Sequence, residues 1–83
     1  MKLLYFAWVR EKIGVAEEIS DLPEGVSNVS DLIDWLKTKG GGYSEAFSDN
    51  MIIRVAVNQE YVMLDHPIMP EDEIAFFPPV TGG

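Results

Sequence analysis

The chain has 83 residues, of which 14 are acidic and 6 are basic, so its formal net charge at pH 7 is −8. A chain of this length forms one small domain, with little room for both a hydrophobic core and a deep catalytic cleft. We therefore expect its chemistry to be shared with a partner. The scattered basic residues argue against nucleic-acid binding, which needs clustered lysine and arginine. Cysteine is absent, which excludes disulfides, thiolate nucleophiles and cysteine-ligated metals.

The first residues resemble a secretory signal only in part. Lys2 precedes an apolar run, but Arg10, Glu11 and Lys12 follow at once, without the small residues of a cleavage site. No run approaches the roughly 18 apolar residues of a membrane span. We expect a cytoplasmic protein that does not enter a membrane.

The predicted fold opens with two strands. The apolar run at residues 3–9 predicts a strand covered on both faces, which belongs in the middle of a sheet. After a turn at Gly14, residues 15–22 predict a weaker strand that pairs with the first as a hairpin.

One amphipathic helix is predicted next. Apolar residues recur at the spacing i, i+3, i+4 and i+7 from Val29 to Leu36, and charged residues take the other side. Asn28 is placed to cap the first turn, and Lys37 and Lys39 suit the carbonyl end of the helix dipole. This pattern indicates a helix that packs on the core.

Three strands complete the predicted sheet. The glycines at 40–42 predict a flexible link, followed by a polar and aromatic segment at residues 43–50 that could hold a short helical turn. Further strands are predicted at residues 51–57, 61–64 and 73–77, separated by turns. The order of strand, strand, helix and three strands predicts an α+β fold, with a mixed sheet of about five strands clasping one main helix.

Few side chains offer catalytic chemistry. Asp65 and His66 could form an acid–base pair, but Asp-His-Pro is also a good turn sequence, which we favour. The acidic residues 71–73 are interpreted as a solvated turn, and no metal site is expected. A small enzyme built on His66 is the less favoured alternative, because a lone histidine lacks the other catalytic groups.

Several methionine and aromatic residues are ambiguous between core and surface. We interpret Met51, Met63 and Met69 as core residues that fill gaps. One helix can cover only one face of the sheet, so some apolar surface should be left for a partner. The aromatic candidates for that surface are Tyr5, Trp8, Trp35 and Phe77.

An extended tail is predicted after the last strand. Pro78 and Pro79 end the strand, because neither can donate to a ladder. Gly82 and Gly83 carry no side chains, so a terminal carboxylate there can pass through a narrow channel. Adenylation would activate that carboxylate, and attack by a nucleophile would leave an acyl product on Gly83. A frayed terminus is the alternative.

Four stretches carry a resemblance to known proteins: Phe6-Ala7 with Arg10-Glu11 and Gly14; Val57-Asn58; Asp65-His66-Pro67; and Asp72-Glu73-Ile74-Ala75-Phe76-Phe77-Pro78-Pro79-Val80-Thr81-Gly82-Gly83. With them the chain resembles the ubiquitin-like sulfur carriers, and most closely the small subunits of molybdopterin synthase. The order of elements agrees along the whole chain, whereas residues 15–50 are generic. Trp8 and the glycines at 40–42 are not part of the family pattern.

The resemblance implies a β-grasp domain at residues 1–77, with the first and last strands parallel at the sheet centre, and a tail at residues 78–83. It implies that an activating enzyme adenylates Gly83 with ATP, and that a sulfur donor protein converts the product to a thiocarboxylate. The tail then delivers sulfur to cyclic pyranopterin monophosphate in the large subunit of a heterotetramer. The small subunit itself is not a catalyst and binds no cofactor.

The resemblance also implies residue roles. Gly83 carries the sulfur and Gly82 keeps the approach narrow, while the neighbouring tail residues line the insertion channel: Val80, Thr81, Pro78 and Pro79. Phe77 anchors the docking surface. Arg10 either pairs with a partner carboxylate or has a simple surface role. The net charge of −8 predicts basic docking surfaces on the partners.

Other functions stay open from the sequence. A Gly-Gly ending is shared with sulfur carriers for thiamine synthesis and with ubiquitin-like modifiers that are attached to lysines. A different class is a non-catalytic interaction module, whose binding rests on the exposed aromatic face and not on the tail.

Overall fold

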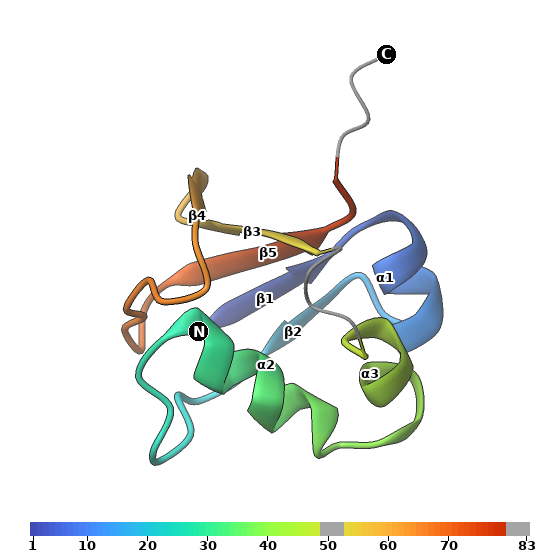
Figure 1. Cartoon of the computed structure of the whole chain (residues 1–83), viewed down its shortest axis with the longest axis horizontal. Coiled ribbons are helices and arrows are strands. Elements are labelled where there is room, and N and C mark those ends of the chain that lie inside the picture. Colours follow the sequence, from blue (N-terminus) through green and yellow to red (C-terminus); the bar gives the residue numbers. More distant parts are fainter. Residues whose placement is uncertain (49–52, 80–83) are drawn as a thin grey trace.

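The structure, a computed structural model, describes residues 1–48 and 53–79. Within them one mixed sheet has the strand order β2-β1-β5-β3-β4 (Figure 1). The strands are β1 (Lys2–Tyr5), β2 (Glu17–Ile19), β3 (Arg54–Val57), β4 (Glu60–Val62) and β5 (Glu73–Phe77). The helices are α1 (Ala7–Ile13), α2 (Val29–Lys37) and α3 (Gly41–Ala46), and none in this part of the chain is long and apolar enough to cross a membrane.

The two central strands come from opposite ends of the sequence. β1 and β5 are parallel, with Leu3 beside Ile74 and Tyr5 beside Phe76. β2 pairs antiparallel with β1, and β3 pairs antiparallel with both β5 and β4. The predicted central position and parallel pairing of the first and last strands are confirmed, as is the β-grasp fold.

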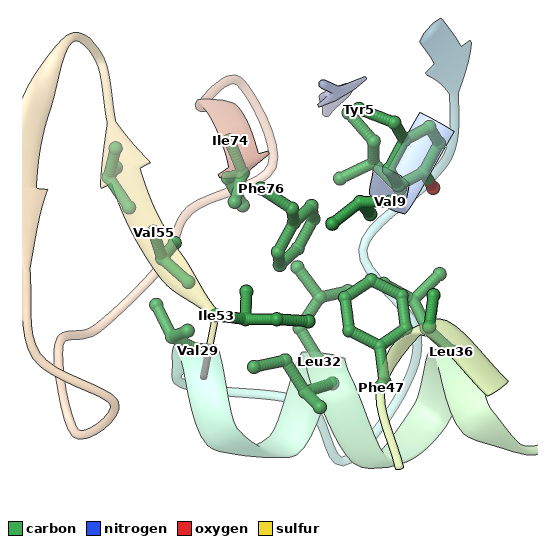
Figure 2. Close-up of a cluster of buried hydrophobic side chains, with 14 of the residues drawn as sticks. Tyr5, Val9, Val29, Leu32, Leu36, Phe47, Ile53, Val55, Ile74 and Phe76 are labelled. Carbon is green, nitrogen blue, oxygen red and sulfur yellow. The ribbon is translucent and has the colours of Figure 1, made fainter. Parts of the chain in front are cut away.

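The core lies between one face of the sheet and α2. Strand side chains alternate between faces, and the inward set includes Tyr5 and Phe76, which are at most 1% exposed. The Phe76 ring stacks on Tyr5 with centroids 5.9 Å apart and meets the Phe47 ring edge-on at 5.1 Å. Figure 2 shows Leu32 of α2 below this group, in the same apolar cluster. Each such side chain contributes about 1.5–3 kcal/mol by leaving water.

The predicted helix α2 is confirmed, and so is its predicted N-cap residue. Asn28 Oδ1 accepts a hydrogen bond from the backbone N–H of Asp31 at 2.8 Å. The Asp31 carboxylate accepts one from the backbone N–H of Ser27 at 3.1 Å. The two side chains thereby satisfy N–H groups at the helix start that have no partner within the helix.

The predicted first strand is wrong beyond Tyr5, because α1 begins at Ala7. Val9 is buried as a strand residue would be, yet it belongs to a helical face that it shares with the partly buried Ile13 four positions on. Residues 10–12 between them are exposed, and Gly14 ends the helix at a left-handed φ of 97°. The first two strands pair as predicted, but α1 lies between them, and β2 is shorter than residues 15–22.

The predicted flexible link at residues 40–42 is also wrong. Gly41 and Gly42 form the first turn of α3, which packs against α1. A Cβ atom on Gly42 would lie 1.8 Å from the Lys12 carbonyl oxygen, so the close approach of the two helices requires glycine there.

The hairpin of β3 and β4 is confirmed. Asn58 and Gln59 form its two-residue turn, and both have positive φ, as the tight turns of twisted hairpins require. Of the predicted strand at 51–57, residues 51–52 lie outside the described residues and β3 begins at Arg54. β5 has the predicted bounds of 73–77.

Candidate functional site

One face of the sheet is covered by no helix of residues 1–48 and 53–79, and we call it the open face. Figure 1 shows α2 and α3 together on the opposite side of the sheet. Because side chains alternate along a strand, the open face carries the residues between the buried ones. They are Lys2, Leu4, Glu17, Ile19, Arg54, Ala56, Tyr61, Glu73, Ala75 and Phe77.

Aromatic side chains gather on the open face where β5 ends. Phe6, Tyr61 and Phe77 line a hollow of about 320 Å³ whose floor includes Ala56 and Ala75. The Tyr61 and Phe77 rings lie 5.6 Å apart, and the Tyr61 side chain is 79% exposed. Exposed apolar groups collected in one place are typical of a surface that binds another protein.

A larger groove of about 990 Å³ adjoins this hollow. Tyr61 and Phe77 line both, and the groove also includes Arg54 and Met63. Met63 is 79% exposed. The aromatic hollow and the groove therefore form one continuous surface beside the end of β5.

Phe77 lies where the strand gives way to the predicted tail. It is the last residue of β5, half-buried, and paired across the sheet with Arg54. Pro78 and Pro79 follow and are also half-buried. The predicted site residues at 80–83 lie outside the described residues, so the predictions for Val80, Thr81, Gly82 and Gly83 stay predictions.

Arg10 lies on α1, at the same end of the sheet. α1 starts beside the end of β5, because the backbone N–H of Phe6 donates to the Phe76 carbonyl oxygen at 3.1 Å. The Arg10 side chain is exposed, and its predicted pairing with a partner carboxylate stays a prediction.

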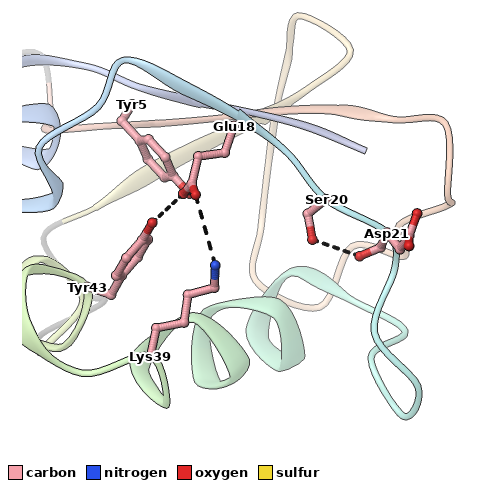
Figure 3. Close-up of polar contacts among 6 residues, drawn as sticks. All are labelled: Tyr5, Glu18, Ser20, Asp21, Lys39 and Tyr43. Carbon is pink, nitrogen blue, oxygen red and sulfur yellow. Dashed lines mark hydrogen bonds and ion pairs between the residues drawn. The ribbon is translucent and has the colours of Figure 1, made fainter.

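A polar cluster joins four elements on the covered side of the sheet (Figure 3). Glu18 Oε1 accepts hydrogen bonds from the hydroxyls of Tyr5 at 2.9 Å and Tyr43 at 2.6 Å. Lys39 Nζ lies 4.0 Å from Glu18 Oε2 and 5.0 Å from the ring centroids of Trp35 and Tyr43. The cluster ties β1, β2, α3 and the segment after α2 together.

The tyrosines of this cluster are held in their neutral form. Burial, with the bond to the Glu18 carboxylate, raises the pKa of Tyr5 far above its ordinary value. The same two causes raise the pKa of Tyr43 to about 12. A protonated tyrosine that donates to a carboxylate is no base at neutral pH, so we assign the cluster a structural role.

The turn interpretation of His66 is supported. Its backbone N–H donates to the Met63 carbonyl oxygen at 3.1 Å, and its carbonyl accepts from the Val29 N–H at 3.0 Å. The segment is thereby fixed against the start of α2. In the acidic turn, the Asp72 carboxylate accepts from the Met69 N–H at 2.8 Å and from Asn58 Nδ2 at 2.9 Å. The described residues hold no group of three potential metal ligands.

Two surface assignments from the sequence are wrong. Met63 and Met69 are not core residues, since they are 79% and 62% exposed; Met51 lies outside the described residues. Tyr5, offered as a surface aromatic, is a core residue. Trp8 and Trp35 are partly buried against the core, which leaves Phe77 as the partner-facing candidate.

Sequence reasoning missed Phe6 and Tyr61. Tyr61 and Met63 are two positions apart, so in an edge strand they belong to the same face; that spacing was the available signal. Phe6 lies within the apolar run at residues 3–9, which predicts a single strand and gives no signal that this one side chain is exposed.

The comparison with protein families decides the identity of the fold. The model described as "ThiS family" matches residues 3–83. The chain belongs to the ThiS family. Among its curated relatives, a protein of Escherichia coli (strain K12) is 40% identical over 100% of this chain and 99% of its own length. One of Dictyostelium discoideum is 42% identical over 99% and 94%. Both are named molybdopterin synthase sulfur carrier subunit, and the resemblance seen in the sequence is confirmed.

Solved structures of similar proteins share this ThiS family fold. A putative molybdopterin converting factor, subunit 1, of Pyrococcus furiosus superposes with a TM-score of 0.75 at 35% identity, covering 95% of both chains. The small archaeal modifier protein 1 of Haloferax volcanii superposes with a TM-score of 0.73 at 29% identity, covering 96% of this chain and 97% of its own. The solved structures similar to this chain thus carry names for two different roles.

Proposed function

We propose that this chain is the sulfur carrier subunit of a molybdopterin synthase. The observation that carries the proposal is the family match, which runs to residue 83 and includes the ending Phe-Phe-Pro-Pro-Val-Thr-Gly-Gly. The names of the full-length relatives support it. So does the position of Phe77, the last residue of β5, beside an exposed aromatic surface.

The proposed chemistry takes place on the Gly83 carboxylate. An activating enzyme transfers AMP from ATP to a carboxylate oxygen and releases pyrophosphate. Sulfide-level sulfur supplied by a donor protein then attacks the acyl carbon, the bond from that carbon to the AMP oxygen breaks, AMP leaves with the electron pair, and the product is a thiocarboxylate. Gly82 and Gly83 suit this role because no side chain hinders either face of the acyl group. The chain is a substrate of these steps and not their catalyst.

In the proposed complex, the large subunit supplies the active site for sulfur transfer to cyclic pyranopterin monophosphate. Residues 78–83 enter that site, with Pro78, Pro79, Val80 and Thr81 lining the channel. Phe77, with Tyr61 and Phe6 beside it, docks on the large subunit. We expect a heterotetramer with two copies of each subunit.

Mass spectrometry of the intact chain tests the proposal. After incubation with activating enzyme, ATP and a sulfur donor, the chain should gain the mass that corresponds to replacing one oxygen by sulfur, and fragmentation should place the gain on Gly83. A control chain extended by one phenylalanine after Gly83 should fold equally well and gain nothing. An unchanged mass of the wild-type chain in a system that loads a known carrier would refute the proposal.

A protein modifier is the second candidate, and the structural likeness to small archaeal modifier protein 1 favours it over a purely structural role. A modifier would form an amide between Gly83 and a lysine of another protein. Recovery of such conjugates from cells, in place of a complex with a large subunit, would support the modifier role. Recovery of a thiazole synthase would indicate a carrier for thiamine synthesis.

A further inference from the structure

The two ends of the open face differ in charge. At the end remote from the tail, Lys2 lies beside Glu73 in the β1–β5 register, and Lys2 Nζ is 3.3 Å from Glu17 Oε2. At the tail end, Arg54 is the single charged residue among the open-face strand positions, directly across from Phe77. The two ends lie four residue positions apart along β5, from Glu73 to Phe77, which is roughly 13 Å.

Arg54 also differs from the lysines in its pairing. Each of the four lysines lies within ion-pair distance of a carboxylate: Lys2 with Glu17, Lys12 with Glu45, Lys37 with Asp34 and Lys39 with Glu18. Within residues 1–48 and 53–79, Arg54 has no such partner, although Glu60 and Asp65 line the same groove. Arg54 is exposed, and the groove that it lines also includes Tyr61, Met63 and Phe77.

Docking of Phe77 has a consequence for Arg54. The two residues are cross-strand partners, so a protein that buries the Phe77 ring also covers the arginine. A covered charge is costly unless it is paired, and the planar guanidinium is best matched by two carboxylate oxygens.

We infer that Arg54 is a specificity-determining residue of the open face, which binds an aspartate or glutamate of the protein that takes up the tail. The inference rests on the proposed function, in which that protein is the large subunit. The partner surface then presents an apolar side chain to the hollow of Phe6, Tyr61 and Phe77 and a carboxylate to Arg54. The partner surface opposite Arg54 is therefore acidic, whereas the net charge of −8 predicts docking surfaces that are basic as a whole.

Binding of variants of the whole chain to the large subunit tests the inference. The question is whether reversing the charge at Arg54 weakens or strengthens the binding. Arg54→Glu and Lys37→Glu change the net charge equally, but Lys37 lies on α2, on the covered side of the sheet. Arg54→Gln removes the charge alone. Calorimetric titration gives the dissociation constants, and thermal unfolding checks that the exposed Arg54 variants fold as the wild type does.

We expect Arg54→Gln to weaken binding about 30-fold or more, as for truncation of a covered charge pair, and Arg54→Glu to weaken it further. Lys37→Glu should change it less than about 3-fold. If Arg54→Glu binds as well as or better than the wild type, the inference is overturned and the proposed function stands. If the wild type itself does not bind the large subunit, both fail.

Discussion

Phe76 and Phe77 are consecutive residues of β5, yet they belong to opposite faces of the sheet. Phe76 is fully buried between Tyr5 and Phe47, whereas Phe77 is half-buried beside the exposed Tyr61. Phe76 is packed on all sides by residues of the chain itself, whereas part of the Phe77 side chain is left without a packing partner among the described residues. The difference indicates that the covered face stabilises the fold, and it supports our proposal that the open face binds a partner.

The largest expected effect is on stability, from Phe76→Ala. The substitution leaves a cavity among core side chains and should lower the free energy of unfolding by about 3–5 kcal/mol. Urea unfolding followed by circular dichroism measures it. Phe76→Leu, which keeps most of the volume, is the matched control and should cost much less. A loss below about 1 kcal/mol for Phe76→Ala would contradict the separation of the two faces.

The neighbouring substitution, Phe77→Ala, should act on binding. We expect a loss of about 2 kcal/mol in affinity for the large subunit, with a much smaller loss of stability than for Phe76→Ala. The control is Ile19→Ala, because Ile19 is 79% exposed on the same face but lies on the edge strand β2, away from β3 and β4. Equal effects of the two substitutions on affinity would show that no particular end of the open face is used.

The smallest expected effect is the pH dependence of the covered side. Unfolded tyrosines release their protons near pH 10, whereas Tyr43 in the folded chain holds its proton up to about pH 12. The unfolded state therefore binds fewer protons between these values, so stability falls as pH rises above about 10. Urea midpoints should decrease from neutral pH to about pH 11, with a shallower decrease in Tyr43→Phe. A midpoint that stays constant over this range would contradict the stabilisation of neutral Tyr43 by burial and by its hydrogen bond to Glu18.

The sequence predicts those features of the fold that depend on residues close together in the chain. The stripe and cap of α2 depend on residues within one helix, and the strand at 73–77 is bounded by turn residues and prolines, so both were predictable. The end of β1 was not, because Val9 is equally apolar in a strand or a helix and only tertiary packing decides between them. The requirement for glycine at position 42 could not be predicted from neighbouring residues. The Lys12 carbonyl that excludes a side chain there lies 30 positions earlier in the sequence.

The candidate site divides in the same way. The end of β5 at Phe77 was predictable because the two prolines after it have consequences that do not depend on the rest of the fold, whereas the predictions for residues 80–83 lie outside the described residues. Tyr61 and Arg54 were missed because their importance comes from the β3–β4 and β3–β5 registers, which place them beside Phe77. The pairing of strands distant in sequence was needed to find them.

Backbone hydrogen exchange of the full-length chain, free and bound to the large subunit, tests the division between the two faces most directly. We predict slower exchange on binding in β3, β4 and the residues next to Phe77, with little change in α2. Slower exchange confined to α2 and α3, with β3 and β4 unchanged, would contradict the assignment of the open face as the docking surface.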